Sequence, residues 1–223
     1  MKRIQRICTL LIPALLVAAL LAGCHQPAPS AAPTDPAASI APHASSDPSP
    51  AVDTSGLTDF EKQLVEQANN VPLEDFTLPN LDGQMVSTAD FRGKILLLNA
   101  ASSWCGYCKQ EYPILQSASQ QYAEQVAVVG IDTFERQSFD KVEATLRSQL
   151  TEAGVTYPVL VDDDSSIGKW MSPRGSVPTT LLVDADGIVR FMIPGAFPNE
   201  DMLFQILDFM LQHPDLLPAP EAG

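Results

Sequence analysis

The chain has 223 residues and a formal net charge of −14, from 27 acidic and 13 basic side chains. This acidity argues against nucleic acid as a partner, and it disfavours adsorption to an anionic bilayer surface. The length accommodates one domain of ordinary size together with non-globular segments.

The first 23 residues have the composition of an export signal peptide. Lys2, Arg3 and Arg6 form a positively charged start, and residues 7–21 are almost entirely apolar, a run too short for a comfortable membrane span. The run ends in Leu-Ala-Gly followed by Cys24, which resembles the lipobox of bacterial lipoproteins. The resemblance implies a lipid anchor at Cys24. An ordinary signal peptide and a short uncleaved anchor are the alternatives.

Residues 24–55 are rich in Pro, Ala and Ser and lack apolar periodicity, which predicts a flexible tether. We expect the folded domain to span residues 56–217, with a short tail at 218–223. Removal of the signal peptide would take away three basic residues and change the formal net charge from −14 to −17. Because His25 rather than an aspartate follows Cys24, analogy with enteric bacteria weakly favours the outer membrane.

Only two of the four cysteines are predicted to remain as free thiols in the mature protein. Cys8 lies in the predicted signal peptide and Cys24 is the predicted acylation site, so Cys105 and Cys108 remain as free thiols. An exported compartment permits disulfides. Because the predicted domain holds no other cysteine pair, we expect this dithiol to be functional rather than structural.

Apolar spacing and turn residues within the domain alternate between helical and extended patterns. In the first half they predict a helix from residue 56, a hairpin within 73–86 around an Asp-Gly turn, a helical turn at 87–93, a buried strand at 94–100 and a helix to about 123. A strand at 125–132, a helix at 138–153, a strand at 157–161 and a short helix at 167–171 follow. The domain is predicted to end with a hairpin of strands at 179–183 and 188–193 and a helix at 199–211. Strand–helix alternation that ends in an antiparallel hairpin and a helix indicates an α/β fold, with a mixed sheet and helices on both faces. Residues 162–166 are predicted to be a solvated loop that caps the short helix after it, because the spacing of Asp162–Asp164 does not match a calcium-binding EF-hand.

Cys105 and Cys108 form a Cys-x-x-Cys pair that follows the buried strand at 94–100 and opens the next helix. A helix N-terminus carries partial positive charge and free N–H groups, which stabilise a thiolate. We therefore expect Cys105, nearer the helix end and more exposed, to attack as the thiolate, and Cys108 to resolve the mixed disulfide. Half of a zinc site is the alternative, but a structural zinc site needs four ligands and the sequence has no second pair.

Three residues near the pair each allow two interpretations. Trp104 would either place an aromatic ring beside the thiols or serve simple packing. Glu111, three residues after Cys108, is either a carboxyl with a raised pKa that exchanges protons with that thiol or an exposed helical glutamate. Pro178 follows Val177 just before a strand, and the low base rate of cis X-Pro bonds favours the trans isomer on physical grounds.

Several short motifs occur together between residues 71 and 212. They are Trp104–Cys108, Glu111, Pro113, Val177–Thr179, Asp75–Leu78, Leu81–Gly83 and Phe91–Lys94. The first four resemble the thioredoxin fold, and more closely its TlpA/ResA-like thiol–disulfide oxidoreductases, which are membrane-anchored and extracytoplasmic. The last three resemble that branch's N-terminal β-hairpin extension, shared with the redoxin-like AhpC/TSA family. The resemblance implies that Pro178 is cis and faces the cysteines, that the Val177 backbone pairs with an extended substrate, and that Glu111 is the active-site glutamate.

Two departures from the family pattern bear on the chemistry. Asn99 stands where thioredoxins carry a buried aspartate, so that proton carrier is absent here. The dipeptide Gly106-Tyr107 replaces the common x-Pro between the cysteines. This dipeptide influences the redox potential, on which the direction of electron flow depends.

The sequence thus predicts a protein thiol–disulfide oxidoreductase in the periplasm, held by a lipid anchor and acting mainly as a reductant of exported proteins. As in the branch that it resembles, a transmembrane disulfide reductase would be the electron donor, and cytochrome c biogenesis is among the implied uses. We predict no cofactor, no metal and no nucleic-acid partner. The alternatives are a thiol peroxidase with Cys105 as the peroxidatic thiol, and a Cu(I)-binding metallochaperone that uses both thiolates.

Overall fold

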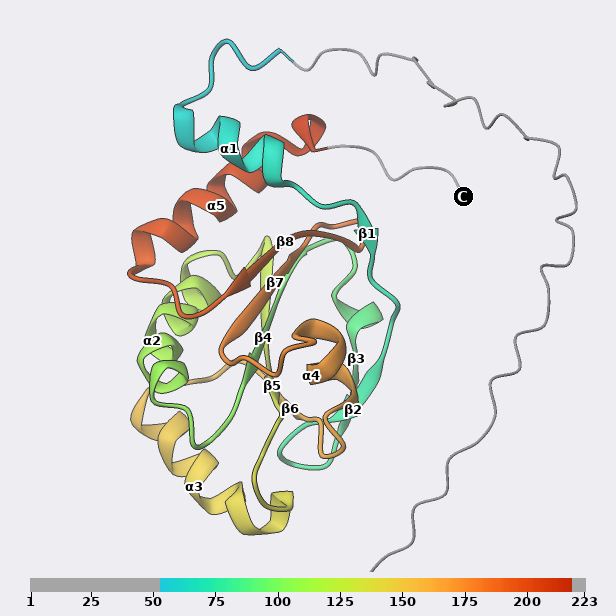
Figure 1. Cartoon of the computed structure of the whole chain (residues 1–223), viewed down its shortest axis with the longest axis vertical. Helices are drawn as coiled ribbons and strands as arrows, with labels where there is room; N and C mark the ends of the chain where they lie inside the picture. The colour runs from blue at the N-terminus through green and yellow to red at the C-terminus, as the bar shows by residue number, and fades with distance from the viewer. Residues whose placement is uncertain (1–52, 218–223) are drawn as a thin grey trace, which may run out of the picture. The chain divides into compact units, whose positions relative to one another are not determined.

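The computed structural model describes residues 53–217. The predicted signal peptide, the lipidation site Cys24, the tether up to residue 52 and the tail at 218–223 lie outside the described residues. A six-stranded sheet in the order β1-β8-β7-β4-β5-β6 forms the centre, and β2 and β3 form a separate hairpin (Figure 1). None of the described helices has the length and apolar character needed to cross a membrane.

Strands and helices alternate along the chain much as the sequence predicts. The strands are β1 Val71–Pro72, β2 Thr77–Pro79, β3 Met85–Ser87, β4 Ile95–Ala101, β5 Val126–Asp132, β6 Val159–Val161, β7 Thr179–Val183 and β8 Ile188–Pro194. The helices are α1 Asp59–Gln67, α2 Gly106–Gln121, α3 Phe139–Glu152, α4 Ser166–Met171 and α5 Glu200–Gln212, with 3-10 turns η1 Thr88–Phe91 and η2 Pro214–Leu216. The sheet is mixed, as predicted, because β4, β5 and β6 run parallel whereas β7, β8 and β1 join in antiparallel pairs.

Strand β4 lies at the centre of the sheet because it is apolar on both faces. All seven of its residues are buried, and it pairs with β5 on one side and β7 on the other. Leu97 and Leu98 point to opposite faces, and each is completely buried in a different core cluster. Burial of a leucine stabilises the fold by about 1.5–3 kcal/mol. The strand is therefore a rigid base for the cysteines that follow its C-terminal end.

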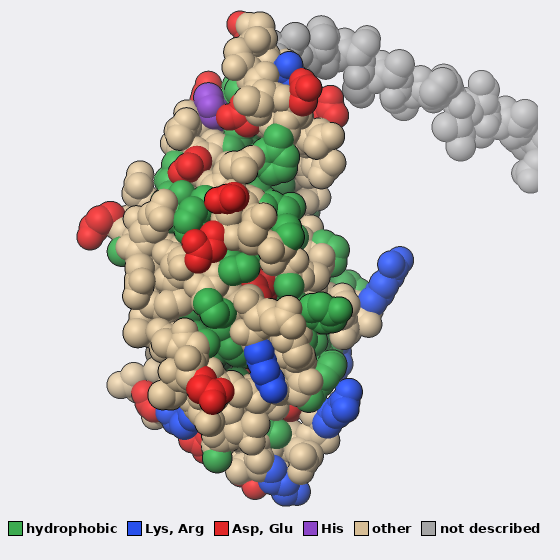
Figure 2. Space-filling view, turned by 90° about the vertical axis from the view of Figure 1, so that its left-hand side faces the viewer, with side chains coloured by type: hydrophobic (Ala, Val, Ile, Leu, Met, Phe, Trp, Pro, Cys, Tyr) green, Lys and Arg blue, Asp and Glu red, His purple; other side chains and the backbone are tan. Residues whose placement is uncertain are grey.

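Helices cover both faces of the sheet, but unequally. One core cluster joins the Leu97 face to α1, α2, α3 and α5. The other joins the Leu98 face to α4 and to the β2–β3 hairpin. In Figure 1, α2 and α5 lie on the left of the sheet, and α4 with the hairpin lies on its right. Figure 2 shows the left-hand side, where acidic and hydrophobic side chains are interspersed on the surface. The predicted N-terminal hairpin thus takes part in covering the second face.

Two local features differ from the prediction. β1 is absent from the predicted elements, because a two-residue strand that includes Pro72 carries no alternating pattern. It pairs at the sheet edge with β8, where a proline is tolerated. The prediction of a solvated loop is wrong for Asp162, which is 2% exposed and accepts hydrogen bonds from the Oγ1 of Thr133 and the backbone N of Gly168. This carboxylate binds N–H groups in the first turn of α4.

Candidate active site

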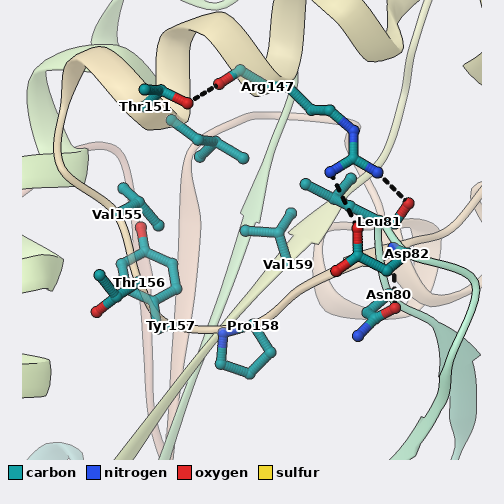
Figure 3. A pocket seen from close by; sticks show the side chains of 11 residues that line it. Asn80, Leu81, Asp82, Arg147, Thr151, Val155, Thr156, Tyr157, Pro158 and Val159 are labelled. Carbon is teal, nitrogen blue, oxygen red and sulfur yellow. Dashed lines mark hydrogen bonds and ion pairs between the residues drawn. The ribbon is translucent and has the colours of Figure 1, made fainter.

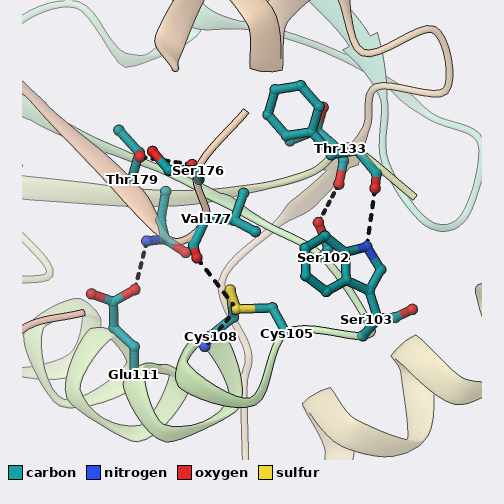
Figure 4. Close-up of a disulfide and its surroundings, with 12 residues drawn as sticks. Ser102, Ser103, Cys105, Cys108, Glu111, Thr133, Ser176, Val177 and Thr179 are labelled. Atoms are coloured by element: carbon teal, nitrogen blue, oxygen red, sulfur yellow. Dashed lines mark hydrogen bonds between the residues drawn. A yellow bond between two sulfur atoms is a disulfide. The ribbon is translucent and has the colours of Figure 1, made fainter. Parts of the chain in front are cut away.

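The two cysteines lie at the N-terminus of α2 and are joined by a disulfide (Figure 4). Cys105 is the N-cap residue, and its Sγ accepts a hydrogen bond from the backbone N–H of Cys108 at 3.1 Å. Cys105 is 5% exposed, whereas Cys108 is fully buried. The sulfur of Cys105 is thus the more accessible one, and it receives the amide and the helix dipole that stabilise a thiolate.

Glu111 lies in the interior to one side of the disulfide, one turn further along α2 than Cys108. Its side chain is 0% exposed. The Oε1 accepts a hydrogen bond from Phe197 N at 3.0 Å, and the Oε2 accepts one from Asn99 Nδ2 at 2.8 Å. Burial raises the pKa of Glu111 to about 7, against the opposing effect of these two hydrogen bonds. The alternative of an exposed helical glutamate is therefore wrong, and this carboxyl can take up or release a proton near neutral pH.

Asn99 connects α2 with β7, the strand that follows Pro178. It lies buried on β4, and its Nδ2 donates both to Glu111 and to Thr180 Oγ1, the latter at 2.9 Å. Because an amide does not ionise, Asn99 orients the Glu111 carboxyl without acting as a second proton carrier.

The loop before β7 faces the disulfide. The Val177–Pro178 peptide bond is cis, as the family resemblance implies and against the base rate. The carbonyl oxygen of Val177 lies 3.6 Å from Cys105 Sγ (Figure 4). The carbonyl of Pro178 accepts a hydrogen bond from Gly195 N at 2.8 Å, and Thr179 pairs with β4. The loop is therefore anchored in the sheet while it presents Val177 to the cysteines.

Two aromatic side chains are exposed next to the cysteines in the sequence. Trp104 is 40% exposed and Tyr107 is 69% exposed. The indole Nε1 of Trp104 donates to Phe134 O at 3.0 Å, and the Arg136 guanidinium lies 4.3 Å from the ring centroid. Trp104 is thus an oriented ring at the surface rather than a residue of simple core packing.

Residues 70–192 match the family model described as the AhpC/TSA family. The chain belongs to this family. Among curated proteins, this AhpC/TSA member is 29% identical over 138 residues to the thioredoxin-like protein YneN of Bacillus subtilis. The aligned part covers 62% of this chain and 77% of YneN. It is 28% identical over 143 residues to the thiol-disulfide oxidoreductase ResA of Geobacillus thermodenitrificans, which covers 64% of this chain and 77% of that protein.

Solved structures show the same fold. A secreted Mycobacterium tuberculosis disulfide oxidoreductase homologous to E. coli DsbE matches with a TM-score of 0.50 and 25% identity, over 60% of this chain and 94% of that one. A thiol:disulfide interchange protein of the thioredoxin family from Chlorobium tepidum matches with a TM-score of 0.55 and 23% identity, over 65% of this chain and 98% of that one. This AhpC/TSA protein therefore has a thioredoxin-like fold, as predicted, and it is an oxidoreductase.

A surface pocket of about 450 Å³ lies between the β2–β3 turn, α3 and the segment before β6 (Figure 3). Arg147 lines it and forms ion pairs with Asp82 and Glu143. Neither cysteine lines this pocket, and none of its lining residues belongs to the predicted site. We therefore assign the chemistry of this AhpC/TSA protein to the disulfide and its surroundings.

The predicted site residues in the described part of the chain come together around the first half of α2 (Figure 4). No group of three or more His, Cys, Asp or Glu side chains that could hold a metal ion occurs in residues 53–217. The sequence gives no sign of the contact from Phe197 N to Glu111, because it depends on how the segment before α5 folds over α2. Asn99 was conspicuous only as a departure from a pattern, and its link to Glu111 follows from the structure.

Proposed function

We propose that this protein is an extracytoplasmic thiol–disulfide oxidoreductase that reduces disulfides in exported proteins. The observation that carries the proposal is the Cys105–Cys108 pair at a helix N-terminus near a buried Glu111 whose pKa is about 7. The thiol-disulfide oxidoreductase ResA and the secreted disulfide oxidoreductase among its relatives support the same chemistry.

The reaction transfers two electrons from the dithiol to the substrate. The Cys105 thiolate attacks one sulfur of the substrate disulfide, so that a mixed disulfide forms and one substrate thiolate leaves. Cys108 gives its proton to Glu111 and attacks Cys105 Sγ, which closes the intramolecular disulfide and releases the second substrate thiolate. The proton on Glu111 then neutralises a departing thiolate. The Cys105–Cys108 disulfide of the structure is the oxidised end of this cycle, and an external dithiol must reduce it.

The substrate is an extended segment that docks against the loop of Val177 and cis-Pro178. The carbonyl of Val177 lies next to the attacking sulfur and can accept a backbone hydrogen bond from such a segment. Trp104 and Tyr107, which adjoin the cysteines in the sequence, supply exposed apolar area for binding. Aromatic rings of this kind contribute strongly to protein binding at low cost in conformational entropy.

The N-terminal sequence and the family resemblance support the proposed compartment and partners. Residues 1–23 are a lipoprotein signal peptide, Cys24 carries the lipid and residues 24–55 are the tether that positions the domain in the periplasm. His25 favours the outer membrane. A transmembrane disulfide reductase supplies the electrons, and cytochrome c biogenesis is one pathway that such a reductant serves.

The redox potential of the pair tests the direction of electron flow. Equilibration with glutathione or dithiothreitol buffers should give a potential toward the reducing side, in the range of thioredoxin at about −270 mV. A value near that of the oxidant DsbA, about −120 mV, would leave an oxidase instead.

Trapping of the mixed disulfide tests the roles of the cysteines. Cys108→Ala should accumulate covalent complexes with protein substrates through Cys105, because the resolving thiol is missing. Cys105→Ala is the matched control and should trap none. If Cys105→Ala traps substrates and Cys108→Ala does not, the two roles are reversed.

A thiol peroxidase is the second candidate, because the AhpC/TSA family match covers residues 70–192. In that reaction Cys105 would be oxidised to a sulfenic acid by a peroxide, and Cys108 would condense with it to the disulfide. Rapid thiol-dependent consumption of hydrogen peroxide by the wild type, lost in Cys105→Ala, would favour this candidate over the disulfide reductase.

A further inference from the structure

The residues that join β4 to the redox cysteines are held by the loop that follows β5, residues 133–136. The hydroxyl of Ser102 donates to the carbonyl of Thr133. The indole of Trp104 donates to the carbonyl of Phe134 and lies under the guanidinium of Arg136. Each contact joins one residue of the segment before the dithiol to one residue of this loop. We call residues 133–136 the clamp loop.

Ser103 is held most completely. Its backbone N–H and its hydroxyl both donate to the carboxylate of Glu135, the hydroxyl at 3.0 Å. Its carbonyl accepts a hydrogen bond from Gln149 Nε2 at 3.1 Å. Both carboxylate oxygens of Glu135 are therefore used to fix a residue that lies two positions before Cys105.

Asp132 lies directly before the clamp loop and interacts with Glu135. Its side chain is 4% exposed, and its Oδ1 has no hydrogen-bond donor within residues 53–217. The titratable groups that face it are Glu135, Asp162 and Asp163 from the loops after β5 and β6, Tyr112 from α2, and Tyr157 from the segment before β6. None of these groups is a cation. Burial, followed by the charge and the hydrogen bond of Glu135, raises the pKa of Asp132 to about 8.

Asp132 is buried beside Glu135, and no cation is among the groups that face it, so its neutral, protonated form is favoured. A protonated Asp132 can donate a hydrogen bond to Glu135, whose two oxygens also accept the two hydrogen bonds from Ser103. We propose that Glu135 is a positioning residue for Cys105, which fixes the Ser103–Trp104 segment, and that protonated Asp132 holds Glu135 in place. The consequence for disulfide exchange rests on the proposed function.

Ionisation of Asp132 at alkaline pH would remove this donor, leave two acceptors facing each other, and loosen the hold of Glu135 on Ser103. The indole of Trp104, which adjoins Ser103, reports this change. The experiment uses the oxidised full-length protein, in which Cys105 and Cys108 do not titrate, with Trp170→Phe so that Trp104 is the single tryptophan of the chain. Its emission is recorded from pH 6 to 9.5. We expect a transition centred near pH 8, with greater quenching by acrylamide on the alkaline side.

Asp132→Asn in the same background should abolish this transition, because an asparagine donates to Glu135 at every pH and cannot ionise. The exposed Asp140→Asn is the matched control and should retain it. A wild type without a transition, or a transition that persists unchanged in Asp132→Asn, would overturn the proposal. Glu135→Gln provides a second test if Asp132→Asn folds poorly. A glutamine can donate its side-chain amide to an ionised Asp132, so nothing pushes residue 135 away from Ser103 and the transition near pH 8 should be lost; a transition that persists unchanged would contradict the pairing.

Reactivity links the clamp loop to Cys105. The rate of reduction of the disulfide by dithiothreitol is measured at pH 7 and pH 9.5 for wild type and Asp132→Asn, so that the ionisation of the reagent cancels in the ratio. The ratio of the wild-type reduction rate to that of Asp132→Asn should differ severalfold between pH 7 and pH 9.5. An equal ratio at the two pH values would refute the positioning role. Because neither measurement uses a protein substrate or an electron donor, both remain valid if the proposed direction of electron flow is wrong.

Discussion

Replacement of Glu111 by Gln should remove a pH dependence of stability that arises between about pH 4.5 and pH 7. The pKa of the buried carboxyl is about 7 in the folded protein, against 4.5 for an ordinary glutamate. This difference of about 2.5 pKa units corresponds to roughly 3 kcal/mol. Because the folded state has the higher pKa, the stabilisation is fully present below about pH 4.5 and is lost as the pH rises through 7.

Glu111→Gln cannot ionise, so its free energy of unfolding relative to that of the wild type should rise by about 3 kcal/mol between pH 4.5 and pH 8. A constant cost of about 1–3 kcal/mol is superimposed, because a glutamine presents one acceptor oxygen to the two donors, Asn99 Nδ2 and Phe197 N. Urea denaturation of the oxidised protein at intervals of pH measures both parts. The exposed Glu124→Gln is the control and should show no pH-dependent difference. A difference that does not vary with pH for Glu111→Gln would refute the raised pKa.

The same variant tests the role of Glu111 as a base. Turnover of a disulfide substrate should fall by on the order of 10²-fold, the lower end of the usual effect of general acid–base catalysis. The wild-type rate should rise with pH through about 7 as the carboxylate forms, and this inflection should be absent from the variant. Alkylation of Cys105 should change little, because its thiolate depends on the helix N-terminus rather than on Glu111. If turnover is unaffected, Cys108 loses its proton by another route.

Two further substitutions have defined outcomes. Gly168→Ala would place a Cβ 2.1 Å from Thr133 Oγ1, and such overpacking should lower the free energy of unfolding, measured by urea denaturation, by about 1–3 kcal/mol. Gly56→Ala, with no atom within 4 Å of the new Cβ, is the control. Equal effects of the two substitutions would contradict the close contact. Trp104→Ala removes an exposed aromatic ring and its contact with Arg136. It should lower kcat/KM for a protein substrate by about tenfold, equivalent to about 1.4 kcal/mol, while reduction of the disulfide by dithiothreitol falls less; equal losses would argue against substrate docking.

The sequence predicts those parts of the structure that depend on local pattern. Strand β4 was predictable because the apolar run Ile95–Leu98 indicates burial on both faces of a strand. The hairpin of β2 and β3 was predictable from its Asp-Gly turn. Edge strand β1 was not, because its stability comes from pairing with β8 rather than from its own two residues.

The residues of the site also fall into those that the sequence pattern identifies and those that depend on contacts between distant segments. Spacing identified Cys105 and Cys108, but it could not decide whether Glu111 is buried, because an exposed and a buried glutamate occupy the same position in a helical pattern. Burial depends on α5 and on the segment of Phe197 that covers α2, both distant in sequence. The wrong prediction for Asp162 has the same origin: an acidic run suggests solvent, whereas the N–H groups of α4 and the hydroxyl of Thr133 hold this carboxylate inside.

The polar groups near the disulfide form two separate proton systems. Under α2, one carboxyl, Glu111, faces an amide, Asn99, so a single proton titrates and the amide only orients it. Beside the segment that leads to Cys105, Glu135 accepts from Ser103, and burial together with the neighbouring Glu135 raises the pKa of Asp132 to about 8. An ionisable group is therefore free to exchange protons where catalysis needs a base, whereas the proton of Asp132 fixes geometry. If a carboxyl replaced the amide of Asn99, that carboxyl and Glu111 would titrate as a coupled pair. The residue that orients Glu111 would then also change the pKa of Glu111, which is a physical reason for asparagine at this position.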